Sequence, residues 1–335
     1  MEIGSPDRVK LTAAEAQALA EHTLRKIGYD AEEARIIADH CVDAALCGYE
    51  YSGLPKILNV VEHRQLRQPR RPMRPIRETP LSVLFDGGNN CGMVTMYRAT
   101  QVAISKAREN GMSVVGVNNS WVSGRSAHYV EMVARAGLIG MHTVSSRIHV
   151  AAPGSRDPAT GTNPIAFGFP TQDDPFVVDL GTSAFMGTDL IFQERRNAVL
   201  PEGVAIDRQG QLTRDPAQVH ALLPFGGYKG FALALAMQAF GVLAGSGLGD
   251  DKTYGYLVMA IKPDMLVPLE DFRRDVSAML ARVKATPRQP GVDEIRIPSE
   301  RALRERARAL REGIEIDLKI YEALEAVPEG RLAQL

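Results

Sequence analysis

Three glycine-containing segments combine residue types that could bind or process a small molecule. They span residues 161–164, 178–183 and 226–230. Each is expected beside a strand end, where small residues let the backbone approach a ligand closely. In the third segment Lys229 lies between glycines at the start of an apolar helix expected at 231–245, so a cation and a helix N-terminus coincide. This arrangement predicts a site for a phosphate or a carboxylate.

Two titratable residues lie near these segments. Asp179 ends a predicted strand among apolar residues, and it either caps the following turn or has a raised pKa and a functional role. His149 precedes a loop at 150–154, and it either is a satisfied histidine or approaches a substrate. Both alternatives stay open for each residue at this point.

An α/β framework is expected to hold these residues in place. Capping-box patterns begin at Thr12 and Asp30 and predict helices at 13–27 and 31–47. From residue 81 onward, helical patterns alternate with short β-branched apolar runs. The helices are expected at 95–110 and 126–136, and the strands at 112–117, 138–144, 164–169, 176–179 and 256–261.

The two ends of the chain are expected to form a separate unit. Ser299 can cap a helix that packs back on the N-terminal helices. A stretch rich in proline and arginine between them cannot sustain a helix or a central strand, so we interpret residues 65–80 as a connector. We therefore expect a helical subdomain formed by residues 1–75 with 298–335, and a sheet domain of residues 80–297.

The composition indicates a globular protein of about two domains. The 335 residues are 45% hydrophobic and 24% charged, and 39 basic against 40 acidic side chains leave a formal net charge of −1. Nucleic acid is therefore not expected as a partner, because the chain has no positive field to hold a polyanion. The N-terminus shows no secretory pattern, and the apolar stretch at 231–245 is too short to cross a bilayer. We expect a buried helix there and no membrane partner.

Known motifs are sparse. The three cysteines, Cys41, Cys47 and Cys91, form no CxxC pair, so neither a disulfide framework nor a metal site is expected, and a cytoplasmic location is favoured. The sequence also lacks the GxGxxG pattern of a Rossmann fold and the P-loop, zincin and α/β-hydrolase motifs. The chemistry must be carried by another arrangement.

Five segments taken together resemble one enzyme family. They are Gly161-Thr162-Asn163-Pro164-Ile165-Ala166, Val178-Asp179 through Thr182-Ser183, Leu200-Pro201-Glu202-Gly203, Pro224 through Gly230, and Ile297-Pro298-Ser299-Glu300. In this order, over nearly the whole chain, they resemble the malate/L-lactate dehydrogenase family of NAD(P)-dependent oxidoreductases. The resemblance implies an α/β (α+β) fold in which a helical subdomain joins a mixed-sheet cofactor domain that is not a Rossmann fold. It also implies NADPH or NADH as cofactor, a small carboxylate-bearing substrate and a homodimer.

The resemblance further implies which residues contact the cofactor. These are, in chain order, Ser123, Gly124, Asp179, Leu180, Gly181, Thr182, Tyr228, Lys229, Ser299 and Arg301. Lys229 and Arg301 can pair with phosphate groups, and the amides of Gly181 and Gly230 are expected to be exposed to the ligand.

The chain departs from the family at both of the family's histidines. Ser52 stands where the family has a proton-donating histidine, and Val122 stands at the second one. Lys56 replaces an arginine that holds the substrate carboxylate, and lysine keeps the charge but loses the bidentate fork. The resemblance therefore implies Lys56 as the carboxylate anchor, and Ser52 and Thr162 as hydrogen-bonding partners of the reacting group.

These residues favour an NAD(P)H-dependent reductase of a small 2-imino or 2-oxo acid. Reduction of a ketone places negative charge on oxygen, for which a positioned acid is worth about a hundredfold or more, and a serine hydroxyl is too weak an acid. A cyclic ketimine can be protonated in solution, so we expect such a substrate to be preferred. Two alternatives stay open: a degenerate family member that binds a nicotinamide cofactor or metabolite without turnover, and a lyase or isomerase that reuses the pocket.

Overall fold

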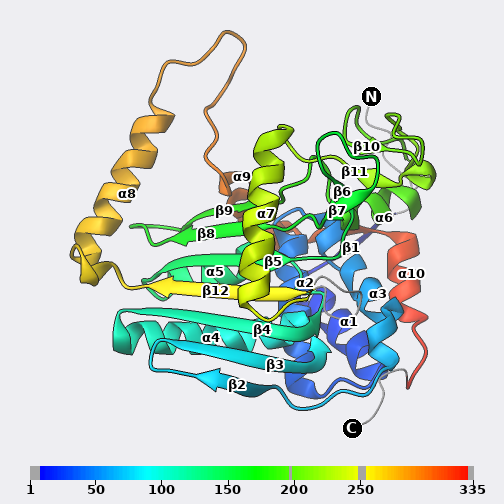
Figure 1. Ribbon diagram of the computed structural model, residues 1–335, viewed down its shortest axis with the longest axis horizontal. Helices are drawn as coiled ribbons and strands as arrows, with labels where there is room; N and C mark the ends of the chain where they lie inside the picture. Colours follow the sequence, from blue (N-terminus) through cyan, green and yellow to red (C-terminus); the bar gives the residue numbers. More distant parts are fainter. Residues whose placement is uncertain (1–7, 196–197, 248–253, 331–335) are drawn as a thin grey trace.

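A large mixed sheet supports the molecule in the computed structural model, which describes residues 8–195, 198–247 and 254–330 (Figure 1). Its seven strands run in the order β2-β3-β4-β12-β5-β8-β9. Their bounds are β2 (Arg74–Glu78), β3 (Ser82–Cys91), β4 (Met112–Trp121), β12 (Gly255–Ile261), β5 (Ile139–Ser145), β8 (Ile165–Phe169) and β9 (Phe176–Leu180). Only β3 and β4 pair in parallel, and the other neighbours pair antiparallel. The mixed sheet confirms the expected α/β fold class.

Helices cover both faces of this sheet. The bounds are α4 (Gly92–Asn110), α5 (Ser126–Arg135) and α7 (Tyr228–Leu243). Figure 1 shows α7 crossing the face opposite to α4 and α5. Side chains alternate across a strand, so β12 contributes Tyr256 and Val258 to the core with α4 and α5 and turns Leu257 toward the other face.

The two chain ends pack together into a helical unit. Its helices are α1 (Ala13–Lys26), α2 (Ala31–Leu46), α3 (Pro55–Glu62), α9 (Glu300–Glu312) and α10 (Leu318–Glu325), with the 3-10 helices η1 (Glu50–Ser52) and η2 (Arg64–Arg67) beside α3. They share an apolar core, and β1 (Arg8–Leu11) pairs antiparallel with β13 (Ile314–Asp317). The exact division into domains at 1–75 with 298–335 and 80–297 stays a prediction.

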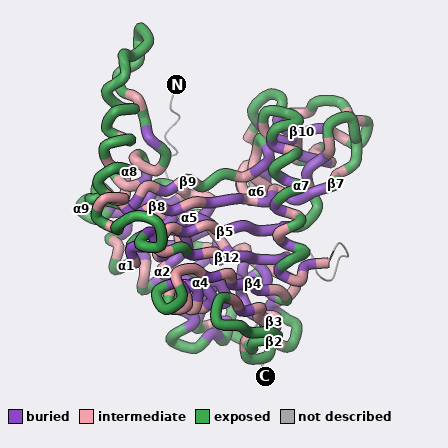
Figure 2. The backbone as a smooth tube through the Cα atoms, turned by 60° about the vertical axis from the view of Figure 1, so that its left-hand side comes forward, coloured by how far each residue is buried: buried purple, intermediate pink, exposed green. Residues whose placement is uncertain are grey.

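A smaller sheet with its own apolar core adjoins the large one. Its strands, in spatial order, are β10 (Ala205–Ile206), β11 (Ala221–Leu222), β6 (Val150–Ala151) and β7 (Pro158–Thr160), and α6 (Gly187–Arg195) and η3 (Pro216–Gln218) accompany them. By contrast, α8 (Leu269–Lys284), preceded by η4 (Pro263–Met265), projects from the body (Figure 1). No residue of α8 is buried, and it appears mostly green in Figure 2.

A predicted helix start forms as expected when its capping residues bond each other and no distant side chain competes for them. At α1 the capping box forms completely, because Thr12 Oγ1 accepts the Glu15 amide and Glu15 Oε2 accepts the Thr12 amide at 2.8 Å. At α2 only half of the box forms. Asp30 accepts the Glu33 amide at 2.8 Å, but Arg70 Nη1 donates to the Glu33 carboxylate at 2.6 Å and draws it away from the cap.

Three local expectations are wrong. The helix at 231–245 is not buried, because only its small-residue stripe and Met237 face the sheet, and Leu243 is 62% exposed. The connector contains β2, an edge strand on which proline is tolerated. Ser299 does not cap α9: its φ is 70°, and its hydroxyl donates elsewhere. Within the described ranges, no helix is long and apolar enough to cross a membrane.

Candidate active site

The three glycine-containing segments meet at one junction beside β8, β9 and the start of α7. The carbonyl oxygen of Thr162 accepts hydrogen bonds from the amide and the hydroxyl of Thr182 at 2.9 and 3.0 Å. The carbonyl oxygen of Thr182 in turn accepts the amide of Phe225, directly before Gly226, at 3.1 Å. The sequence indicates each segment separately, and the fold holds them side by side.

Asn163 fastens this junction to α7. Its side chain is fully buried, and its φ of 26° lies in the left-handed region that asparagine tolerates better than most residues. Its Oδ1 accepts the amide of Ser146 at 2.8 Å, and its Nδ2 donates to the carbonyl oxygen of Ala234 on α7 at 3.0 Å. One amide side chain therefore joins a strand end, a loop and a helix.

The glycines of the junction differ in what surrounds them. The buried amide of Gly230 donates to the carbonyl oxygen of Phe225 at 3.0 Å, so the expectation that this amide is exposed to a ligand is wrong. A Cβ at Gly181 would lie 2.4 Å from Met186 Sδ, so a larger residue there would have to displace this flexible side chain. A Cβ at Gly227, the N-cap of α7, would meet no atom within 4 Å. A ligand can therefore approach the segment at 226–230 most freely at its start, near Gly227.

The start of α7 has the chemistry of a phosphate site. Tyr228 is 75% exposed, Lys229 is also exposed, and no side chain caps the helix N-terminus. Lys229 makes no ion pair with any residue in the described ranges. A helix N-terminus carries partial positive charge, and a lysine adds a full one. These residues therefore fit the pyrophosphate of a dinucleotide.

Asp179 connects the junction to α5. Its Oδ2 accepts the amide of Ala127, in the first turn of α5, at 2.7 Å. The surrounding protein raises the pKa of Asp179, whereas the Ala127 amide and the charge of Arg125 lower it. The carboxylate is nevertheless open to solvent, as is the neighbouring Leu180. Asp179 is thus a cap, but of a helix distant in sequence and not of the following turn.

Ser123 and Gly124 form a tight loop directly before α5. The carbonyl oxygen of Ser123 accepts the hydroxyl of Tyr129 at 2.5 Å. Gly124 has a φ of 74°, and a Cβ there would lie 2.1 Å from His40 Nε2. The hydrogen bond from Ala127 to Asp179 therefore brings two groups of predicted cofactor residues close together. One group is 179–182, and the other is 123–124, directly before α5.

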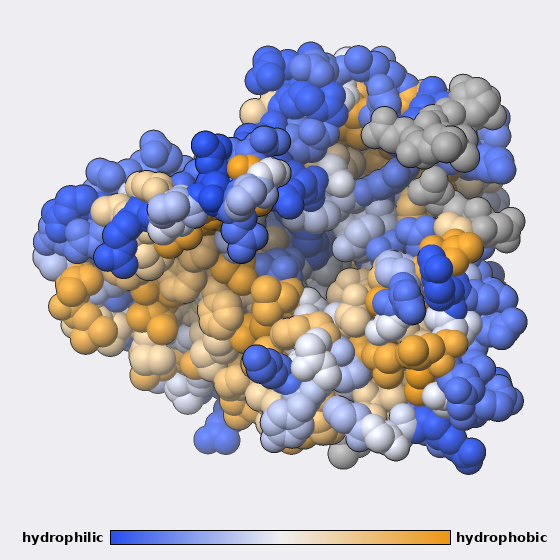
Figure 3. All heavy atoms as spheres, turned by 90° about the horizontal axis from the view of Figure 1, so that it is seen from above, coloured by the Kyte–Doolittle hydropathy of each residue, from blue (hydrophilic) through white to orange (hydrophobic). Residues whose placement is uncertain are grey.

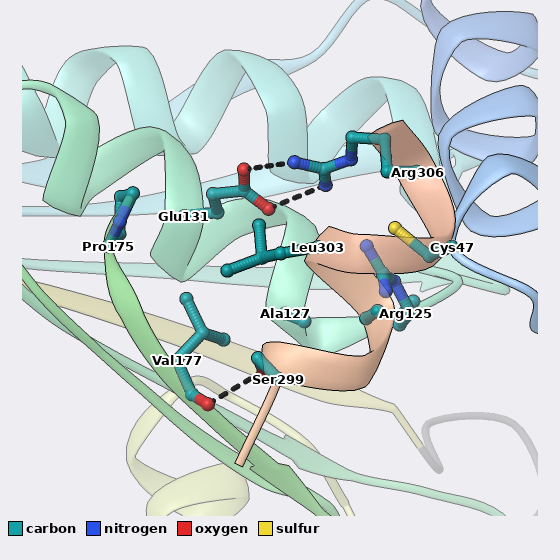
Figure 4. Close-up of a pocket in the computed structure, with 10 residues that line it drawn as sticks. Cys47, Arg125, Ala127, Glu131, Pro175, Val177, Ser299, Leu303 and Arg306 are labelled. Carbon is teal, nitrogen blue, oxygen red and sulfur yellow. Dashed lines mark hydrogen bonds and ion pairs between the residues drawn. The ribbon is translucent and has the colours of Figure 1, made fainter. Parts of the chain in front are cut away.

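Ser299 and Arg301 hold the start of α9 against other elements. Ser299 Oγ donates to the carbonyl oxygen of Val177 on β9 at 2.7 Å (Figure 4). Arg301 Nη1 donates to the carbonyl oxygen of Cys47 at 3.3 Å, and its guanidinium lies 4.7 Å from the centre of the Tyr49 ring. Both polar groups are engaged within the protein.

A small pocket lies beside Ser299, between α5, β9 and α9 (Figure 4). Arg306 forms a two-pronged ion pair with Glu131 across it, at 2.7 and 2.8 Å. The cavity measures about 10 Å³, which is room for about one water molecule. The pocket is a tightly packed contact between α5, β9 and α9, and it is too small to hold a nucleotide.

Lys56 is buried without a counter-charge. It lies in the first turn of α3, is 6% exposed, and makes no side-chain hydrogen bond or ion pair with the described part of the chain. The groups that act on its charge are the thiols of Cys41 and Cys91, and burial raises the pKa of each thiol to about 12, so both are neutral at pH 7. Burial lowers the pKa of Lys56 to about 8.

Ser52 precedes Lys56 by four residues. It ends η1, which lies against α3 and α6, and it is 9% exposed. Burial raises the pKa of the neighbouring Tyr51, and the charges of Asp189 and Asp179 add to this shift.

Thr162 and His149 lie on the smaller-sheet side of the junction. Thr162 Oγ1 is 3.4 Å from Ser146 Oγ, directly before Arg147. His149 is half-buried, and a Cβ at Gly187 would lie 3.7 Å from its Cδ2, so its ring lies against the start of α6. Burial and the charge of Arg147 lower the pKa of His149, which is therefore mainly neutral at pH 7.

The sequence matches the malate/L-lactate dehydrogenase family over residues 11–325, nearly the whole described fold. The chain belongs to this family. The malate/(S)-sulfolactate dehydrogenase of Methanothermus fervidus is 31% identical to it over 333 residues, covering 94% of this chain and 96% of the relative. The ureidoglycolate dehydrogenase (NAD⁺) of Escherichia coli strain K12 is 30% identical, covering 94% and 95%.

Solved structures agree with this assignment. The malate dehydrogenase from Pyrococcus horikoshii OT3 superposes with a TM-score of 0.85 at 28% identity, covering 98% of this chain and 99% of that one. The Δ1-piperideine-2-carboxylate reductase from Pseudomonas syringae gives a TM-score of 0.82 at 26% identity, covering 95% and 99%. The chain is therefore an NAD(P)-dependent oxidoreductase of the malate/L-lactate dehydrogenase family.

The backbone is strained at Val122, the residue that the resemblance places at a histidine position. Val122 has a φ of 54°, which a β-branched residue rarely adopts and which costs about 1–3 kcal/mol. Asn119, three residues earlier, has a φ of 48°.

The sequence did not single out several residues that shape this family site. Arg125 bonds Asp43 and acts on Asp179, Ser146 touches Thr162, and His40 supports the loop at 123–125. The position of Arg125 directly after a predicted site glycine was a usable signal. His40 carried none, because it lies 85 positions from Arg125 in the sequence.

Proposed function

We propose that the protein is an NAD(P)H-dependent reductase of a small acid whose reacting imine or ketone carbon bears a carboxylate. The burial of Lys56 without a charged partner is the observation that supports this proposal most. A buried ammonium without a partner is destabilising by several kcal/mol, and a bound carboxylate would offset that penalty. Because its pKa is about 8, Lys56 is mostly charged at pH 7 and able to attract such an anion.

The other roles follow from the junction. Lys229 and the start of α7, together with residues 179–182 and the loop at 123–124, would hold NADPH or NADH. Ser52 and Thr162 would donate hydrogen bonds to the reacting group. The cofactor, when bound, supplies the hydride, and the protein positions and polarises the substrate. Ser299 and Arg301 would contact the cofactor only if α9 released their present contacts.

We infer that a cyclic ketimine is a better substrate than a simple 2-oxo acid. Reduction of the ketone needs a proton for the developing alkoxide, whereas a protonated imine already carries that proton. In this arrangement the ammonium of Lys56 binds the substrate carboxylate. Of the other titratable residues described at the junction, His149 is mainly neutral, and the carboxylate of Asp179 already accepts the Ala127 amide. The fold similarity to a piperideine-carboxylate reductase supports this choice.

The proposal is tested by comparing 1-pyrroline-2-carboxylate with 1-pyrroline, which lacks the carboxylate, under NADH and NADPH. We expect oxidation of one cofactor with the carboxylate compound and little with the other. Equal turnover of both would contradict the role of Lys56. Cofactor binding, followed by the fluorescence of Trp121, without turnover of any imino or oxo acid would favour the alternative of a non-catalytic family member.

We also propose a homodimer in a reducing, cytoplasmic setting. All three cysteines are buried and unpaired, which suits a reducing compartment. Exposed apolar side chains gather over the face that carries α7 and α8 (Figure 3). They include Leu235, Val242, Leu243, Met279 and Val283. A monomer rarely leaves such an area uncovered, and a second copy would bury it.

A further inference from the structure

We propose that His40 is a positioning residue for the loop at 123–125 and, through this loop, for the nicotinamide cofactor. The inference rests on the proposed function, in which Ser123 and Gly124 contact NADPH or NADH. His40 lies on α2, where its ring packs against α5, and nothing about its sequence position links it to a cofactor. Its contacts in the fold supply that link.

One hydrogen bond ties the ring to the loop. His40 is 2% exposed, and its Nε2 accepts the backbone amide of Arg125 at 2.7 Å, although the two residues are 85 positions apart. The amide precedes α5 and would otherwise be one of the unpaired donors of a helix start. Nδ1 has no partner among the described residues, so this single bond accounts for the polar contacts of the ring.

Packing adds a second constraint. A Cβ at Gly124 would lie 2.1 Å from His40 Nε2 and 2.7 Å from its Cδ2, so the loop backbone rests directly on the ring. The loop cannot shift toward α2 without a clash. The ring therefore limits how close the loop can come to α2, and it orients the backbone N–H of Arg125.

Two rings of α5 pack against His40. The rings of His128 and Tyr129, both on α5, have centroids 4.5 and 5.5 Å from that of His40. The side chain of Arg125 also bonds Asp43, which lies on α2 close to His40, at 2.7 Å. Arg125 is thus attached to α2 by its amide and by its guanidinium.

The charge state of His40 suits this role. The Arg125 amide needs an unprotonated Nε2 as acceptor. Burial, followed by the charges of His128 and Arg125, lowers the pKa of His40 well below its ordinary value, although Asp43 opposes this shift. The imidazole is therefore neutral at pH 7 and can accept the Arg125 amide.

His142 offers a matched control. It is fully buried, its pKa is lowered by burial to about 3, and neither of its ring nitrogens has a partner among the described residues. Its ring lies 5.0 Å from that of Tyr129, whose hydroxyl donates to Ser123, but His142 makes no hydrogen bond of its own to the loop at 123–125 within the described ranges. A substitution there removes a buried histidine without removing the bond to Arg125.

The test compares His40→Leu, His40→Gln and His142→Leu by two measurements, hydrogen exchange of the Arg125 amide and NADH or NADPH titration. In His40→Leu we expect exchange to rise about tenfold and the cofactor Kd to rise about threefold to tenfold, the scale of one hydrogen bond. The kcat at saturating cofactor should change less than twofold. His40→Gln, whose carbonyl oxygen can accept the same amide, should restore both values, and His142→Leu should leave them unchanged.

Three outcomes would overturn the inference: unchanged exchange in His40→Leu, faster exchange with an unchanged Kd, or an equal loss in His142→Leu. If His40→Leu fails to fold, His40→Asn, whose amide is too short to reach Arg125, takes its place. Failure of the proposed function looks different. The wild-type protein would then bind neither NADH nor NADPH, while the exchange rates would still report whether His40 holds the loop.

Discussion

Lys56 is the residue whose surroundings most constrain the chemistry. Replacing it with methionine keeps the buried aliphatic chain and removes the charge. We expect the KM for a 2-imino acid to rise about tenfold to a hundredfold, since a charge-assisted contact contributes about 1.5–3 kcal/mol. The KM for cofactor should stay nearly constant, and steady-state kinetics with both substrates varied will separate the two. A Lys56→Met enzyme with unchanged substrate KM would remove Lys56 from the site.

The same residue predicts a pH dependence. Its pKa is lowered from 10.5 to about 8, so the charged form that binds a carboxylate is present below pH 8 and is lost as the pH rises above it. A planar acid without a titrating imine, such as pyrrole-2-carboxylate, should therefore inhibit less strongly as the pH passes through about 8. In Lys56→Arg, which stays charged, inhibition should not change in this range. A constant inhibition constant from pH 7 to 9 in the wild-type protein would contradict the assignment.

At the scale of elements, the start of α7 should carry the affinity for the cofactor phosphates. Replacing Lys229 with alanine removes the full charge and leaves the helix N-terminus in place. We expect cofactor binding to weaken by about 1.5–3 kcal/mol, with no change in melting temperature, because Lys229 is exposed and unpaired in the described structure. Titration against Trp121 fluorescence measures the affinity. Unchanged binding would move the phosphate site elsewhere.

One buried amide side chain, that of Asn163, helps to attach α7 to the sheet. Asn163→Asp would place a carboxylate against the carbonyl oxygen of Ala234, where Nδ2 now donates, and would bury its charge. We expect the free energy of unfolding to fall by about 3 kcal/mol or more, which thermal and denaturant melts will show. A stability within about 0.5 kcal/mol of wild type would mean that this contact is not important for the attachment of α7.

What the sequence could predict at this scale depends on the range of the interactions. The α1 start was predictable because Thr12 and Glu15 bond each other. The half-formed cap at Asp30 was not, because Arg70, forty residues away, binds Glu33. The position of α7 was predictable from its apolar run, but its exposure was not, since burial depends on which other surfaces are present.

The candidate site, too, has features that depend on local sequence and features that depend on distant contacts. Its segments were predictable because they contain small and polar residues beside strand ends, but their meeting point needed the hydrogen bonds of Thr162 and Thr182. The isolation of Lys56 could not be read from the sequence, because it is set by side chains from α2 and β3. The roles of Ser52, His149 and the cofactor residues stay predictions.

The whole molecule leaves an apolar face uncovered, and we expect a dimer to cover it. Light scattering at micromolar concentration should give twice the 36.5 kDa of one chain. Leu235→Arg on α7 should shift the protein toward monomer, because Leu235 is 49% exposed in the apolar area. Ile76→Arg, equally exposed on the edge strand β2, is the control and should stay dimeric. A wild-type particle of 36.5 kDa would contradict the homodimer.

The central claim is that this family member reduces a carboxylate-bearing imine without a histidine acid. The most direct measurement is the ratio of kcat/KM for 1-pyrroline-2-carboxylate to that for pyruvate, with NADH and with NADPH. We predict a ratio of at least about a hundred, the usual value of a positioned acid that only the ketone needs. The rate with the imine should fall as rising pH removes its proton. Faster reduction of pyruvate would contradict the account and would show that another group donates the proton.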